Sequence, residues 1–170
     1  MDSVKKLETL VGGLFKSAPP LPKNARDMLV KAWPWIALIF GILQLMAAWG
    51  LWNLARSVDR LNTIANIYTY QTGLSSSDRF MIYLGIAVLV VDAVILLMAY
   101  PELAKRKARG WDLLFLGSII NVVYSLVSLF ISDRGAGTFF FSGISSVIGF
   151  YLLFQVRPAY KGGTKKSRKS

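Results

Sequence analysis

The sequence predicts an all-α membrane protein, a four-helix transmembrane bundle preceded by a short amphipathic N-terminal helix. Of the 170 residues, 54% are hydrophobic, which is more apolar surface than a soluble chain of this size easily buries, yet the net charge is +11. Apolar residues also gather in four runs of about 20 residues, the length that a helix needs to cross about 30 Å of hydrocarbon. These predicted spans are 35–54, 80–100, 111–131 and 138–156.

The segment before the spans, residues 1–32, carries an apolar stripe at helical spacing, with charged residues off the stripe. Its members are Val4, Leu7, Val11 and Leu14. Such a segment is typical of an amphipathic helix that lies on the cytoplasmic membrane surface. A flexible tail with chance periodicity is the alternative interpretation. A second short helix is expected to lead into the first span, kinked or restarted at Pro34.

Turn and breaker residues divide the region 33–156 into its spans. Residues 55–79 form an outer segment that is too short to fold as a domain, part of which is expected to be an interfacial helix. Pro101 is expected to end the second span because proline removes a backbone donor and clashes with the preceding turn. Gly135, Ala136 and Gly137 fit a tight hairpin between the last two spans. The basic tail, 157–170, is expected to be disordered.

The distribution of Lys and Arg predicts the orientation. Sixteen of the twenty lie in 1–32, between the second and third spans, or in the tail, and these three segments share one side of a four-span protein. Four lie on the other side: Arg56, Arg60, Arg79 and Arg134. Because Lys and Arg favour cytoplasmic loops, both termini are predicted to be cytoplasmic, in a plasma (inner) membrane protein.

Each span carries a stripe of small or polar residues, the kind of surface through which helices associate in lipid. The predicted packing positions are Gly41, Gly85, Gly117, Ser125, Ser128 and Gly149. These faces are expected to point into the bundle or toward a second copy of the chain.

Hydrogen-bonding side chains recur at one depth. Gln44, Asp92, Asn121 and Ser146 each lie about eight to ten residues from the cytoplasmic end of their span. At 1.5 Å per residue this is roughly 12–15 Å, close to the middle of the bilayer. The sequence therefore predicts one polar layer made by all four spans.

Asp92 is the most informative member of this layer. A carboxylate at the bilayer centre is costly, and no basic residue lies at its depth, so we expect it to be protonated and hydrogen-bonded to Asn121 or Gln44. Two roles are open: a proton- or cation-handling acid in a transport path, or a hydrogen-bonding link between helices. The second is favoured because nothing else in the sequence points to transport.

Other chemistry is largely excluded. The chain contains no Cys and no His, which removes the commonest metal and haem ligands and the commonest general base. No cofactor, metal site or catalytic residue is expected, and the chain is not expected to be an enzyme.

The expected partners are the lipid bilayer, a second copy of the chain or another membrane protein. Binding of nucleic acid is not expected because the basic residues lack interleaved aromatics. Anionic lipids are expected to contact Lys105, Arg106, Lys107, Arg109, Lys165, Lys166, Arg168 and Lys169. The function predicted is an accessory, scaffold or lipid-contacting membrane component; the alternative is an oligomeric transporter or channel subunit that uses Asp92.

Overall fold

A computed structural model describes residues 2–68, 76–131 and 136–161 of the chain. This part is all helical and contains five α-helices and no strand. The helices are α1 (Asp2–Leu14), α2 (Lys23–Tyr68), α3 (Ser76–Ala104), α4 (Ala108–Ile131) and α5 (Ala136–Lys161). The predicted all-α fold class is therefore confirmed.

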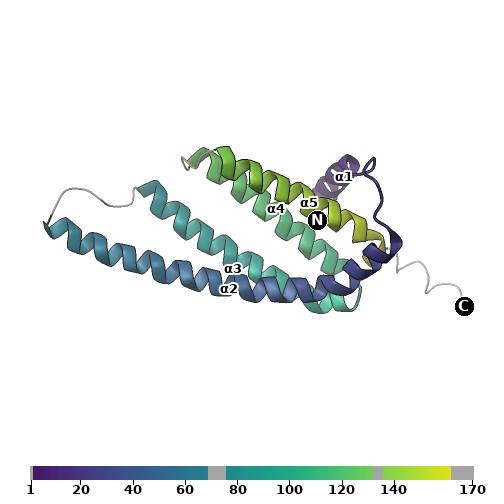
Figure 1. Cartoon of the computed structure of the whole chain (residues 1–170), viewed down its shortest axis with the longest axis horizontal. Helices are drawn as coiled ribbons and strands as arrows, with labels where there is room; N and C mark the ends of the chain where they lie inside the picture. The colour runs from purple at the N-terminus through teal and green to yellow at the C-terminus, as the bar shows by residue number, and fades with distance from the viewer. Residues whose placement is uncertain (1, 69–75, 132–135, 162–170) are drawn as a thin grey trace, which may run out of the picture.

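The four long helices run antiparallel in chain order, each packed on the one before it (Figure 1). One end of the molecule holds the start of α2, the α3–α4 turn, the end of α5 and the short α1; we call this the inner end. At this end α2 also meets α5, where the hydroxyl of Tyr160 donates to the carbonyl oxygen of Val30 at 3.2 Å. Toward the opposite end, the α2–α3 pair and the α4–α5 pair move apart (Figure 1).

Among the described residues, three helical segments are long and apolar enough to cross a membrane. They are Lys23–Val58, Arg79–Ala104 and Ala108–Phe130. These segments contain the first two predicted spans and all but the last residue of the third. The fourth predicted span, 138–156, lies within α5, which is not one of the three.

The most deeply buried side chains cluster at the inner end, between α3, α4 and α5. Trp111 is fully buried, and its indole N–H donates to the carbonyl oxygen of Leu153 at 2.8 Å. Its ring stacks on Phe115 and meets Phe154 edge-on. Trp111 is the first residue of the third predicted span, and the contact of α4 with α5 places it in the core.

Two prolines lie inside helices rather than ending them. Pro34 lies within α2, which runs without interruption from Lys23. Pro101 lies within α3, so the expectation that it ends the second span is wrong. The helix ends instead at a Schellman motif, in which Arg106 has φ 51° and the amide of Lys107 donates to the carbonyl oxygen of Glu102 at 2.9 Å.

Helices also extend beyond two predicted boundaries. The outer segment begins as a direct continuation of α2, which reaches Tyr68 and is 46 residues long. At the C-terminus, α5 continues through Pro158 to Lys161, so the first part of the tail predicted to be disordered is helical. Residues 162–170 and Gly135 of the predicted hairpin lie outside the described residues, whereas Ala136 and Gly137 of that hairpin are the first residues of α5.

Candidate functional site

A hydrogen-bonded group of three side chains joins α2, α3 and α4. Asp92 on α3 is 5% exposed, and its Oδ2 accepts a hydrogen bond from the Gln44 amide at 2.7 Å. The amide of Asn121 on α4 donates to the same oxygen at 3.0 Å. The structure thus brings together three of the four residues that the common depth predicted, and Asp92 has both of the partners that the sequence offered as alternatives.

A glycine lets this carboxyl group approach α4. A Cβ atom built on Gly117 would lie 2.7 Å from Asp92 Oδ1, so any side chain here would collide with the carboxyl group. Asn121 is one turn further along the same helix, and its amide also donates to the carbonyl oxygen of Gly117 at 3.0 Å. On this face of α4, Gly117 thus leaves space for the carboxyl group of Asp92, and Asn121 donates a hydrogen bond to it.

One polar atom in the group has no partner. Gln44 Oε1 is buried and accepts no hydrogen bond from the described residues. A buried acceptor without a donor is costly, typically about 1–3 kcal/mol. On Asp92 both amide donors converge on Oδ2, while Oδ1 lies against Gly117.

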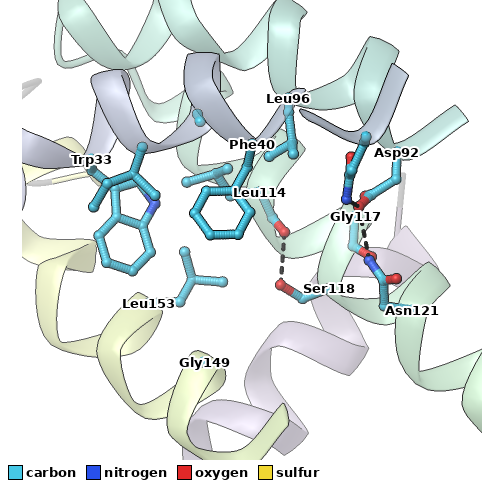
Figure 2. A pocket seen from close by; sticks show the side chains of 13 residues that line it. Trp33, Phe40, Asp92, Leu96, Leu114, Gly117, Ser118, Asn121, Gly149 and Leu153 are labelled. Atoms are coloured by element: carbon cyan, nitrogen blue, oxygen red, sulfur yellow. Dashed lines mark hydrogen bonds between the residues drawn. The ribbon is translucent and has the colours of Figure 1, made fainter. Parts of the chain in front are cut away.

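Gln44, Asp92 and Asn121 form one end of a pocket of about 270 Å³ (Figure 2). Residues of α2, α3, α4 and α5 line this pocket. Trp33 lies toward the opposite end, and Phe40 and Leu114 lie between (Figure 2). The lining residues are Trp33, Ile36, Ala37, Phe40, Gln44, Asp92, Leu96, Leu114, Gly117, Ser118, Asn121, Gly149 and Leu153. Asp92 is the only ionisable residue among them.

Of the other residues predicted for helix packing or for the polar layer, some lie at close contacts between helices and some do not. A Cβ on Gly41 would lie 3.1 Å from Leu97, and one on Gly85 would lie 2.9 Å from the hydroxyl of Tyr124, so both glycines sit at close helix contacts. Gly149 does not: it is exposed, and a Cβ there would meet nothing within 4 Å, so it makes no close helix contact within this chain, and packing against a second copy stays a prediction. Ser146 is half-buried on α5 but does not line the pocket at which the other three layer residues meet.

Ser125 and Ser128 are half-buried on α4. The hydroxyl of Ser128 donates to the carbonyl oxygen of Ser125 at 2.9 Å, a bond within the helix itself. This bond does not by itself link α4 to another helix, so the predicted packing role of the two serines stays a prediction.

A second polar cluster, the inner-end cluster, joins α1, α4 and α5. Glu8 is buried, and one of its oxygens accepts hydrogen bonds from Arg157 at 2.5 Å and Lys161 at 2.7 Å. Lys161 also forms an ion pair with Asp112 at 2.8 Å. The Lys161 ammonium lies 4.3 Å from the centre of the Trp111 ring, within range of a cation–π interaction.

The charges around Glu8 outweigh its burial. Burial alone would raise the pKa of this carboxyl group, but hydrogen bonds and charge attraction from Lys161 and Arg157 lower it, and the net pKa lies below the ordinary value of 4.5. Glu8 is therefore ionised at neutral pH and holds α1 against α5.

The face that α1 presents to the molecule differs from the predicted stripe. Glu8, a residue off the stripe, is buried, whereas Leu7 and Leu14 are exposed. Gly12 also packs closely, since a Cβ there would lie 2.9 Å from the Phe154 ring. Sequence reasoning missed Glu8 because its partners lie about 150 positions away; the only signal available was one acid among the basic residues of the first turns.

The four basic residues of the α3–α4 turn are exposed, as lipid contact requires. They are Lys105, Arg106, Lys107 and Arg109. Lys107 also forms an ion pair with Glu102 at 3.2 Å. The tail residues predicted to contact lipid, Lys165, Lys166, Arg168 and Lys169, lie outside the described residues.

No family model, curated protein or solved structure matches this chain. No group of three or more acids close enough to hold a metal ion occurs among the described residues. The arrangement offers a buried carboxyl group, two amides and a largely apolar pocket.

Replacing Asn121 by Ala removes one of the two hydrogen bonds to Asp92. We expect the protein to lose about 0.6 kcal/mol of stability, the average for single hydrogen bonds between membrane helices, and at most about 1.7 kcal/mol. Thermal or denaturant unfolding in phosphatidylcholine nanodiscs would measure the change. Ser118→Ala is the matched control, because the Ser118 hydroxyl donates only within α4, to Leu114. Equal effects of the two substitutions would contradict a special role for the Asn121–Asp92 bond.

Lowering the pH should release α1. Because the pKa of Glu8 is lower in the folded protein, its stabilising effect is present above pH 4.5 and is lost as the pH falls below that value. A spin label on Ser17→Cys, next to α1, should therefore become mobile in acid. Glu8→Gln should make the label mobile at every pH, whereas Glu102→Gln should not. An immobile label in Glu8→Gln at pH 7 would show that these ion pairs do not hold α1.

Proposed function

We propose that this chain is a small four-span protein of the plasma (inner) membrane that acts as an accessory, scaffold or lipid-contacting component without catalysis of its own. The observation that carries the proposal is the outward apolar surface of the long helices. Large apolar side chains such as Trp35, Ile39, Val91 and Val123 are exposed, while Asp92 is turned inward. This distribution suits a chain surrounded by lipid.

The fourth crossing is supported by the placement of α5. This helix has 26 residues, about 39 Å of length, which exceeds the hydrocarbon thickness. It packs antiparallel on α4, and its axis is roughly aligned with the axes of the other three long helices (Figure 1). Ile144, Val147 and Ile148 on α5 are exposed, in keeping with contact with lipid tails.

A cytoplasmic position for both termini is supported by where the basic residues lie. The exposed α3–α4 turn, the last turn of α5 and α1 all lie at the inner end (Figure 1). These parts belong to the segments that contain most of the Lys and Arg residues. Basic segments on one side favour the cytoplasm and attract anionic lipid headgroups.

Contact with the bilayer surface is supported by α1. With Glu8 turned toward α5, the side chains of Leu7, Leu10 and Leu14 are exposed at the inner end. An apolar face on a helix beside basic segments suits the boundary between headgroups and lipid tails. In this proposal α1 is fixed to the bundle by its ion pairs and rests on the lipid with its leucines.

The alternative, an oligomeric transporter or channel subunit, is favoured by one observation: Asp92 lines a pocket instead of being enclosed by packed side chains. A pocket on one side of the molecule is not a path across the membrane. Transport would therefore need a second copy of the chain to complete a path.

The orientation is testable because the chain has no native Cys. Single cysteines at Lys107→Cys and Thr72→Cys should be labelled from opposite sides by a membrane-impermeant maleimide in oriented vesicles. Lys107→Cys should react only from the cytoplasmic side. Reaction of both cysteines from the same side would contradict the arrangement of spans, and the reverse pattern would contradict only the orientation.

Purification in native-lipid nanodiscs should separate the accessory role from transport. We expect a protein or lipid partner to co-purify in a fixed ratio, and reconstituted chain to give no proton flux above that of protein-free liposomes. A partner-free monomer would count against the accessory role. Flux that Asp92→Asn abolishes, with fold and oligomeric state unchanged, would replace it by the transport alternative.

A further inference from the structure

We propose that the pocket beside Asp92 is a binding site for an apolar organic cation that carries at least one N–H group, such as a protonated amphiphilic amine. The proposal rests on the charge of the pocket, on an unused acceptor in it and on the apolar character of its other end.

The charge of the pocket is one-sided. Asp92 can carry a negative charge, and the lining contains no Lys or Arg to balance it. Gln44 and Asn121 donate hydrogen bonds to the carboxyl group but supply no positive charge. A cation in the pocket would provide this charge. It would favour the ionised form of Asp92, which is expected to be protonated when nothing is bound, because lipid and protein around the site screen the attraction weakly.

The unused acceptor distinguishes an N–H cation from a quaternary one. Gln44 Oε1 is buried without a donor, and its own amide nitrogen is bonded to Asp92. The unpartnered oxygen therefore belongs to the same amide group that donates to the carboxyl group of Asp92. Because this oxygen is buried in the chain alone, the Gln44 amide would have to turn toward the pocket; a primary or secondary ammonium group could then donate to both oxygens and satisfy the atom that the chain itself leaves unsatisfied.

The rest of the pocket suits an apolar or aromatic body. Phe40 and Trp33 line it along α2, and Leu114 and Leu153 line it from α4 and α5 (Figure 2). From Gln44 to Trp33 is eleven residues, about 16 Å along the helix. The volume of about 270 Å³ is slightly below the usual range for small-molecule sites, which begins at about 300 Å³. The ligand is therefore a small one, with its ammonium group at Asp92 and its apolar part toward Trp33.

Two glycines on α5 provide a matched pair of variants. A Cβ on Gly149 or on Gly143 would meet nothing within 4 Å, so a larger side chain fits at either position without a clash. Only Gly149 lines the pocket. Gly149→Leu should therefore fill the pocket, while Gly143→Leu places the same side chain on the same helix, outside the pocket.

The test compares 2-naphthylmethylamine, protonated at pH 7, with the neutral 2-naphthylmethanol of nearly equal shape. Calorimetric titration into full-length protein in phosphatidylcholine nanodiscs, with empty nanodiscs subtracted, separates binding from partition into lipid. We expect the amine to bind at least about tenfold more tightly than the alcohol. Asp92→Asn should remove this difference, and Gly149→Leu should abolish binding of the amine, with Gly143→Leu equal to wild type.

Several outcomes would overturn the proposal: equal binding of amine and alcohol, an unchanged preference in Asp92→Asn, or equal behaviour of the two leucine variants. If Asp92→Asn does not fold, the two leucine variants still decide. The site rests on the proposed membrane location, and the two fail differently, because a chain outside the membrane would fail the maleimide labelling before any ligand is added.

Discussion

The arrangement of the first three long helices depends on one buried carboxyl group. In a membrane a polar side chain has no water to bind, so it must find partners within the protein. Asp92 finds them on both neighbouring helices, with Gln44 on α2 and Asn121 on α4 donating to the same oxygen. The absence of a side chain at Gly117 allows α4 to come close enough. A lateral or rotational slip of either neighbour would break one of these bonds, so the carboxyl group fixes the register of all three helices.

The inner-end cluster fixes the remaining helices in a different way. Trp111 fills the space between α4 and α5, and Lys161 is shared between Asp112, Glu8 and the face of that indole. This connects α5 to α4 and α1 to α5 at one end of the molecule only. Because α2 meets α5 at this end, and because the two helix pairs move apart beyond it, a pocket remains between the cluster and the carboxyl group of Asp92. The two polar clusters are thus the reason that the pocket exists where it does.

Features that depend on distance along one helix could be predicted from the sequence. The rise per residue is constant, so counting from span ends brought Gln44, Asp92 and Asn121 to one level, and long apolar runs marked the spans. Features that depend on which helices are neighbours could not. Gly149 has the spacing of a packing residue but faces open space, and Glu8 is buried because α5 supplies two cations. Trp111 could equally have been an interfacial residue; only the contact of α4 with α5 makes it core.

The length of α2 has a mechanical consequence. From Pro34 to Tyr68 the helix continues for 35 residues, roughly 52 Å, well beyond the thickness of a bilayer core. Asp92 binds it at Gln44, and it still packs on α3 at Trp52, whose ring meets that of Tyr83. The arm from Trp52 to Tyr68 is about 24 Å long, so a tilt of about 10° about Trp52 displaces its far end by roughly 4 Å. Small rearrangements at the Trp52–Tyr83 contact would thus be magnified at the outer tip of α2.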